Sequence, residues 1–138
     1  MLTKEDIRNL LARRFCNDIH KKLSEIPTPS ALKDIYKGAN RIKEAIERNE
    51  HIAIVGDYDV DGVVSSVILA EFFDDLSVKN YLVKIPNRFK DGYGLNPEII
   101  DELASDVSLI ITVDNGISAN EAASICKEKG IDLIITDH

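Results

Sequence analysis

Four short apolar segments, each followed by a turn and then by a helical pattern or the chain's last residues, constrain the fold of this chain most. The sequence predicts strands at residues 52–56, 79–85, 108–113 and 132–136. Short, nearly continuous runs of Val, Ile and Leu are typical of strands buried on both faces of a sheet. Strands that alternate with helices indicate parallel pairing with right-handed crossovers. We therefore expect an α/β fold, a Rossmann-like parallel sheet with helices on both of its faces.

The helices of this sheet domain are predicted from apolar spacing and from capping residues. The first follows an acidic turn and covers about residues 61–75. Asn96 is expected to cap a helix that ends near Ala104, and Ser118 a helix that ends near Lys129, with Gly130 as its C-cap.

The first 50 residues predict two further helices, at residues 3–23 and at about 30–48. Thr3 and Asp6 have the spacing of a loose capping box, and Ser30 is expected to cap the second helix after the break at Pro27 and Pro29. Two amphipathic helices have little core of their own. We therefore interpret residues 1–50 as a helical preface that packs on a sheet domain formed by residues 51–138.

Acidic side chains follow three of the four predicted strands. Asp57, Asp59 and Asp61 come after the first strand, Asp114 after the third, and Asp137 with His138 after the fourth. The carboxyl ends of parallel strands lie at one edge of a sheet, and ligands bind there where the strand order reverses. We therefore expect these side chains to converge on one pocket beside the first strand.

Three carboxylates in one turn repel one another, which indicates that a cation binds there. A helix N-terminus offsets only about 1 kcal/mol, whereas oxygen-rich sites suit magnesium or manganese, and a histidine ligand favours manganese. Two ions sharing a carboxylate are suited to phosphate chemistry. The alternative is that one Asp caps the helix and the others are solvated turn residues.

The loop after the second strand, residues 86–94, is a candidate substrate-binding segment. Arg88 can bind a phosphate as a fork, and Lys90 adds a second positive charge. Gly92 and Gly94 allow the backbone to approach a ligand closely. The alternative interpretation is an exposed surface loop without a ligand.

The charge distribution limits the choice of partners. Residues 1–50 hold 11 Lys or Arg against 8 Asp or Glu, net +3, and residues 51–138 hold 6 against 16, net −10. The acidic second half argues against nonspecific duplex binding by this segment alone. The sequence also shows no membrane-spanning run and no secretory signal, and its two cysteines fit a reduced, cytoplasmic protein.

Four motifs in order resemble the DHH phosphoesterase superfamily. They are GDYDVDG at 56–62, PNR and GYGL within 86–95, TVDNG at 112–116, and ITDH at 135–138. The residues of these motifs are most similar to those of the single-strand-specific 5′→3′ exonucleases of DNA repair and recombination. The resemblance implies hydrolysis of single-stranded DNA from its 5′ end, with two Mn²⁺ or Mg²⁺ ions in the complete enzyme.

The resemblance also implies roles for individual residues. The metal ligands of the family fall on Asp59, Asp61, Asp114 and His138. Asp57 and Asp137 match further motif positions, and we expect them to contribute to catalysis beside the ligands.

The signature that names the family has a second histidine after the pair that stands here at Asp137 and His138. We therefore expect this chain to be a truncated, N-terminal part of such an enzyme and to be inactive by itself. An unpaired strand at the cut edge of the sheet would favour self-association.

Three other functions are compatible with parts of the pattern. A phosphodiesterase of the same superfamily that acts on oligonucleotides or cyclic dinucleotides usually has a His where Asp57 stands. A magnesium-binding phosphoacceptor signalling domain also gathers aspartates at strand ends, but it requires a Lys after a fifth strand. A catalytically inactive relative acting as a scaffold is disfavoured by the intact set of aspartates.

Overall fold

The computed structural model describes residues 3–14 and 26–138, and its contacts divide the chain into two units, Met1–Lys37 and Gly38–His138. The first unit contains helix α1 (Lys4–Arg14) and the short 3-10 helix η2 (Pro29–Ala31). Helix α2 (Ile35–Glu47) begins at the end of this unit, and most of its residues belong to the second. The predicted domain boundary at residue 50 and the packing of residues 1–50 as one preface stay predictions.

The predicted capping box at the start of α1 is confirmed. The Thr3 backbone N–H donates to Asp6 Oδ2 at 2.8 Å, and the Asp6 N–H donates to Thr3 Oγ1 at 3.1 Å. Residues 15–23 of the predicted first helix lie outside the described residues.

The predicted start of the second helix at Ser30 is wrong. Ser30 lies in η2, and the chain leaves helical geometry at Leu32, whose φ and ψ are −71° and 135°. Asp34 then takes a left-handed conformation with φ 56°, so α2 begins only at Ile35. The break between η2 and α2 therefore depends on the backbone conformations of Leu32 and Asp34, which apolar spacing does not reveal.

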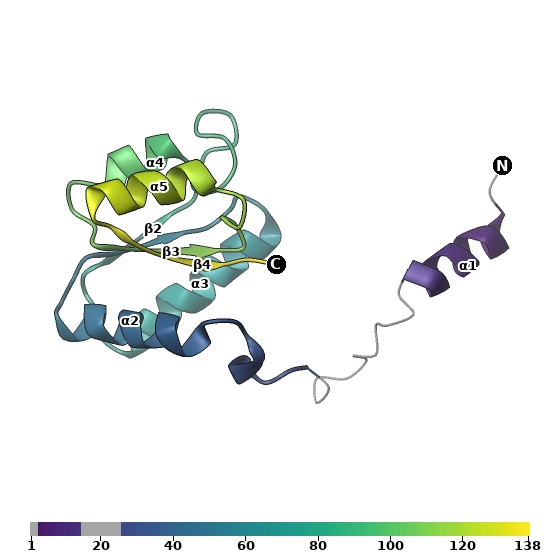
Figure 1. The fold of residues 1–138 in the computed structure, drawn as a ribbon, viewed down its shortest axis with the longest axis horizontal. Helices are drawn as coiled ribbons and strands as arrows, with labels where there is room; N and C mark the ends of the chain where they lie inside the picture. The colour runs from purple at the N-terminus through teal and green to yellow at the C-terminus, as the bar shows by residue number, and fades with distance from the viewer. Residues whose placement is uncertain (1–2, 15–25) are drawn as a thin grey trace. The chain divides into compact units, whose positions relative to one another are not determined.

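The second unit is built on a four-stranded parallel sheet, drawn in Figure 1, with the order β2-β1-β3-β4. Its strands are β1 (Ile52–Val55), β2 (Tyr81–Lys84), β3 (Leu109–Val113) and β4 (Asp132–Thr136). Ile52 is paired with Tyr81 on one side and with Leu109 on the other. The predicted parallel α/β sheet is confirmed, with β2 shorter at both ends than expected.

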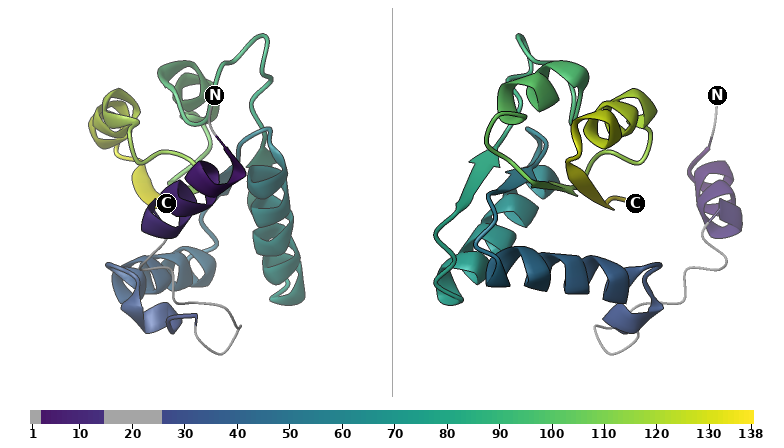
Figure 2. Two further views of the ribbon diagram at one scale, coloured as in Figure 1. Left: turned by 90° about the vertical axis from the view of Figure 1, so that its right-hand side faces the viewer. Right: turned by 60° about the vertical axis from the view of Figure 1, so that its left-hand side comes forward.

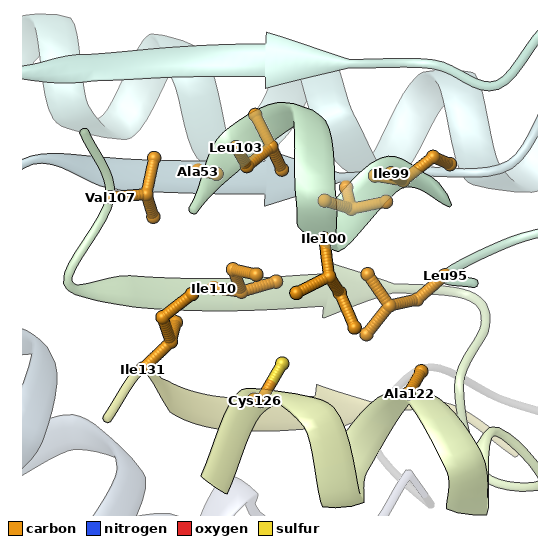
Figure 3. Packing of buried hydrophobic residues seen from close by; sticks show 11 residues of the cluster. Ala53, Leu95, Ile99, Ile100, Leu103, Val107, Ile110, Ala122, Cys126 and Ile131 are labelled. Carbon is orange, nitrogen blue, oxygen red and sulfur yellow. The ribbon is translucent and has the colours of Figure 1, made fainter. Parts of the chain in front are cut away.

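Helices cover both faces of the sheet, as predicted (Figures 1 and 2). Helices α4 (Pro97–Leu103) and α5 (Asn120–Lys129) pack on one face, and α2 and α3 (Val60–Asp75) pack on the other. Because side chains alternate along a strand, Ala53 and Val55 join the α4–α5 core while Ile52 and Ile54 join the α2–α3 core. Figure 3 shows the first core, where Ile100, Ile110 and Cys126 come together.

Two helix termini test the predicted caps of the second unit. Asn96 caps α4, since its Oδ1 accepts from the Ile99 N–H at 3.0 Å, and Gly130 ends α5 in the left-handed region with φ 72°. The predicted cap at Ser118 is wrong, because the N-cap of α5 is Ala119, which makes no side-chain hydrogen bond. No helix of the described residues is long and apolar enough to cross a membrane.

The strand order reverses between β1 and β3. The connection after β1 runs to β2 on one side, and the connection after β3 runs to β4 on the other side. Ligands of α/β proteins bind at the carboxyl ends of the two strands between which the connections diverge in this way.

Candidate metal centre

The turn between β1 and α3 carries the three aspartates that follow the first strand. Asp57 is buried, and its Oδ1 accepts the Tyr58 N–H at 2.7 Å. Asp59 is exposed and caps α3, since its Oδ1 accepts the Gly62 N–H at 3.0 Å. Asp61 lies in the first turn of the helix and is exposed. Helix capping, the alternative considered from the sequence, therefore applies to Asp59 and engages one of its two oxygens.

Gly62 allows α3 to start directly against this turn. A Cβ atom at Gly62 would lie 2.6 Å from the Asp57 backbone nitrogen and 2.8 Å from its Cα. Any larger residue would push the first turn of the helix away from Asp57. The close approach therefore fixes the acidic turn to the end of β1.

A second acidic group forms where β3 and β4 end. One ligand atom from each of Asp114, Asp137 and His138 lies within 4.8 Å of the others. His138 Nε2 is 3.7 Å from Asp114 Oδ1. Carboxylate and imidazole atoms at this spacing fit the ligands of a divalent ion.

Backbone hydrogen bonds hold this second group in place. Asp137 Oδ2 accepts the Ile117 N–H and Asp137 Oδ1 accepts the His138 N–H, each at 2.8 Å. Asp114 has φ 61°, and its N–H donates to the Thr136 carbonyl at 2.9 Å. Aspartate is among the few residues that tolerate the left-handed region. The turn after β3 is thus tied to the end of β4 at two points.

The electrostatic effects join the two acidic groups. The pKa of Asp114 is raised, first by partial burial and then by the charge of Asp59, with smaller contributions from Asp61 and Asp137, while His138 acts in the opposite direction. The pKa of the Tyr93 hydroxyl is also raised, first by desolvation and then by four of these carboxylates. Asp59 and Asp61 therefore lie close enough to Asp114 to oppose its ionisation.

The structure places some of the predicted site residues in one potential ligand group and the others outside it. Asp114 and His138 lie in one potential ligand group, and Asp137, predicted to act beside the ligands, lies in the same group. Within the part of the chain that the structure describes, this group does not include Asp59 or Asp61. The ligand set of Asp59, Asp61, Asp114 and His138 stays a prediction, as do the roles of Asp57 and Asp137.

The loop of residues 86–95 reaches the acidic turn through an aromatic contact that the sequence analysis missed. The guanidinium carbon of Arg88 lies 5.5 Å from the centroid of the Tyr58 ring. Tyr58 also meets Tyr93 edge to face, with ring centroids 6.1 Å apart. The tyrosine between the aspartates of GDYDVDG was the available signal, because an aromatic ring there can hold a cation beside them.

The other predicted loop residues have simpler surroundings. Lys90 and Gly92 are exposed, and Gly92 has φ 81°. Gly94 is buried with φ 57°, and it packs on Asn115 of the turn after β3. The substrate-binding roles of Arg88, Lys90, Gly92 and Gly94 stay predictions.

Comparison with known proteins places these features in a family. A model of the DHH family, N-terminal domain, matches residues 51–138. The chain is 43% identical over 121 residues to the single-stranded-DNA-specific exonuclease RecJ of Bacillus subtilis, covering 87% of this chain and 15% of that protein. It is 38% identical over 126 residues to RecJ of Escherichia coli, covering 91% and 22% of the two chains. The chain thus spans less than a quarter of either relative.

Two solved structures are similar to the structure of this chain. A crystal structure of exonuclease RecJ bound to manganese has a TM-score of 0.75 at 31% identity, over 82% of this chain and 29% of that one. RecJ from Thermus thermophilus in complex with Mn²⁺ has a TM-score of 0.70 at 26% identity, over 94% and 18%. The predicted family resemblance and fold class are confirmed by these similarities.

Proposed function

The chain belongs to the DHH family, and on this premise we propose that it forms the metal-binding edge of a 5′→3′ exonuclease acting on single-stranded DNA. The observation that carries the proposal is the group of Asp114, Asp137 and His138 at the ends of β3 and β4, on which the carboxylates after β1 act electrostatically. Relatives that share 43% and 38% identity with it are exonucleases specific for single-stranded DNA. A role in DNA repair and recombination and a cytoplasmic location are parts of the same proposal.

The residues present fit divalent cations. The donors are carboxylates and one imidazole, which suit Mn²⁺ or Mg²⁺. Partial burial, and then the charges of the neighbouring aspartates, raise the pKa of Asp114. We assign Asp59, Asp61, Asp114 and His138 as ligands for two ions. Such ions supply Lewis acidity and an activated water for phosphodiester hydrolysis.

The side chains around the ligands hold them in position. Asp137 accepts two backbone N–H groups and so orients the turn that carries Asp114 and the residue His138. Asp57 is the buried aspartate of the acidic turn, and its carboxylate accepts the Tyr58 N–H and so holds the backbone there. These two residues contribute to catalysis by keeping the donors oriented.

The substrate backbone is bound by the loop of residues 86–95. Arg88 is placed over Tyr58, directly beside the acidic turn, and its planar fork matches two oxygens of a phosphate. Lys90 adds charge from the exposed part of the loop, and Gly92 and Gly94 give the backbone its left-handed turns. The positive charges of this loop partly neutralise the aspartates at the carboxyl ends of the strands, and the loop brings the scissile phosphate to the metal ligands.

The edge strand β4 offers a surface for self-association. It pairs with β3 alone among the described strands, and a groove of about 430 Å³ beside it is lined by Cys126, Ile131 and Leu133 among others. Unpaired strand edges are templates for pairing with another chain. This groove does not contain the carboxylates, so self-association there would leave the metal-binding edge open.

The test is a nuclease assay on the protein as its gene encodes it. With 5′-labelled single-stranded DNA and Mn²⁺, we expect release of mononucleotides that Asp114→Ala abolishes. Asp106→Ala is the matched control, because this exposed aspartate precedes β3 at the opposite edge of the sheet. Absence of release with either Mn²⁺ or Mg²⁺, or full activity of Asp114→Ala, would contradict the proposal.

A further inference from the structure

Asn115 is a fully buried polar residue in the turn after β3, and its side chain joins three segments of the chain. Its Nδ2 donates to the Val55 carbonyl at 2.9 Å and to the Val113 carbonyl at 3.0 Å. Its Oδ1 accepts the Leu95 N–H at 3.0 Å. Val55 is the last residue of β1, Val113 the last of β3, and Leu95 ends the loop that carries Arg88.

The side-chain amide is the one group of its size that makes all three hydrogen bonds. Two carbonyls require two donors and the Leu95 N–H requires an acceptor, which an asparagine supplies together. An aspartate at this position has no donor for the two carbonyls, and a leucine of similar volume makes none of the bonds. Buried polar groups left without partners are unfavourable, so the site selects an amide.

Gly94 brings the loop backbone into direct contact with the same side chain. A Cβ at Gly94 would lie 3.0 Å from Asn115 Oδ1 and 3.1 Å from Asn115 Cβ. The φ of Gly94 is also positive, at 57°, which disfavours any side chain there. The loop therefore rests on Asn115 by close packing as well as through the Leu95 hydrogen bond.

The anchoring extends from Leu95 into the middle of the loop. Asn96 Nδ2 donates to the Asp91 carbonyl at 2.7 Å, and the Asp91 carboxylate accepts the Asn87 N–H at 2.9 Å. Asn87 directly precedes Arg88. A continuous series of contacts thus runs from the turn after β3 to the residue proposed to bind phosphate.

We propose that Asn115 is a positioning residue that sets where the loop of residues 86–95 lies relative to the carboxylates after β1 and β3. The inference rests on the proposed function, because it assigns Asn115 the task of aligning the substrate phosphate with the metal ligands. A change of about 1 Å in such alignment costs up to about 100-fold in kcat/KM, and displacing Arg88 would cause this loss through weaker substrate binding. Asn115 touches neither substrate nor ions in this role and acts through Arg88.

The first experiment separates positioning from a general contribution to folding. In the nuclease assay at saturating Mn²⁺, Asn115→Ala and Gly94→Ala disturb the same contact from its two sides. We expect both to raise KM at least about tenfold, with Mn²⁺ affinity by calorimetry changed less than twofold. Gly94→Ala keeps the buried amide and serves if Asn115→Ala does not fold.

The controls are two buried polar residues that do not contact the loop. Thr112→Val replaces a buried side chain within β3 whose Oγ1 has no hydrogen-bond partner among the described residues. Ser66→Ala removes a buried hydroxyl that donates to the Gly62 carbonyl within α3. Both are expected to leave KM within twofold of the unaltered protein.

A double-mutant cycle with Arg88→Ala supplies the decisive comparison. If Asn115 acts through Arg88, adding Asn115→Ala to Arg88→Ala raises KM less than twofold further. Independent effects that multiply would overturn the positioning role while leaving the exonuclease activity itself established.

Hydrogen exchange provides a readout that does not depend on activity. We expect Asn115→Ala to increase amide exchange in residues 87–95 at least about tenfold, and Thr112→Val to leave it unchanged. Unchanged loop exchange in Asn115→Ala would overturn the inference even if the protein were active. Increased exchange without any nuclease activity in the unaltered protein would instead refute the proposed function and keep the anchoring of the loop.

Discussion

Both ends of the sheet hold acidic side chains, but in opposite electrostatic environments. At the amino ends of the strands, Arg41 from α2 donates to Glu50 at 2.6 Å and to Asp132 at 2.5 Å. At the carboxyl ends, partial burial raises the pKa of Asp114, the charges of Asp59, Asp61 and Asp137 raise it further, and His138 is the group that opposes them. The chain supplies a permanent cation at one end and leaves the other in excess of negative charge.

The difference shows how a structural acidic cluster can be told from a binding one. Partial burial alone would lower the pKa of Arg41, but its bonds to Asp132 and Glu50 outweigh that effect and leave the pKa raised. Its charge is therefore permanent. At the other end, the aspartates that oppose the ionisation of Asp114 weaken the fold, and cations that bind from solution would compensate them further.

The largest expected effect is on activity, and it should appear at one end only. We expect Asp59→Ala to lower the rate of mononucleotide release at least about 100-fold, since even partners of metal ligands typically cost 10- to 100-fold. Asp132→Ala removes an acid at the other end and is expected to keep activity within twofold. Equal losses in both variants, measured at the same Mn²⁺ concentration, would remove the functional distinction between the ends.

The next largest effect is on stability, and it belongs to the amino end. Arg41→Met leaves Glu50, whose side chain is only 17% exposed, without its partner. We expect a loss of about 2–3 kcal/mol in the free energy of unfolding, less than for a fully buried pair because Asp132 is 63% exposed. Urea unfolding measures the change, and the double variant with Glu50→Gln should recover part of it. A neutral Arg41→Met would show that the pairing is incidental.

A smaller change of opposite sign is expected at the carboxyl end. Because its pKa is raised in the folded state, ionised Asp114 destabilises the fold above that pKa, and stability increases as the pH falls through it. Asp114→Asn removes this charge and keeps a side chain that tolerates a positive φ. In thermal melts at neutral pH without metal, the variant should melt a few degrees higher than the unaltered protein.

Adding Mn²⁺ should reverse the order of the melting temperatures of Asp114→Asn and the unaltered protein. The ion should raise the Tm of the unaltered protein, because ligands that bind only the folded state stabilise it, and should raise that of Asp114→Asn much less. If both proteins respond equally, Asp114 is not a ligand.

The smallest expected effect concerns the loop that faces the acidic end. Arg88→Lys keeps the charge but loses the planar fork and much of the stacking on Tyr58. We expect single-stranded DNA to bind several-fold more weakly, while Mn²⁺ affinity is unchanged. Arg48→Lys, at an exposed position directly after α2, is the matched control. Normal DNA affinity in Arg88→Lys would return the loop to an ordinary surface role.

The sheet was predictable because its signals are local. The apolar runs of β1 and β3 mark strands buried on both faces, and the acids after them must lie at one edge once the strands are parallel. The start of α2 was not predictable, because the left-handed Asp34 interrupts an apolar pattern that continues through it. Ser118 has the right residue type for a cap, but the backbone begins α5 one residue later.

The side-chain contacts that were missed join residues far apart in the sequence. The sequence motif of Asn115 is typical of a plain turn, and its bond to Val55 spans 60 positions. Arg41 resembles any other arginine on an amphipathic helix until Asp132, 91 positions away, is placed beside it. The spacing of residues along the sequence identifies which side chains follow a strand. The residues that they contact become known only once the order of the strands in the sheet is known.

The insertion of β3 beside β1 has a consequence for the timing of folding. Ile52 pairs with Tyr81 in β2, but the carboxylates after β1 meet Asp114 only when Ile52 also pairs with Leu109. Contacts between distant segments form slowly, because a long loop must close first. During synthesis, Asp59 and Asp61 therefore emerge well before the strand that completes their surroundings. In a refolding experiment, the time at which Mn²⁺ binding first appears would mark the time at which β1 pairs with β3.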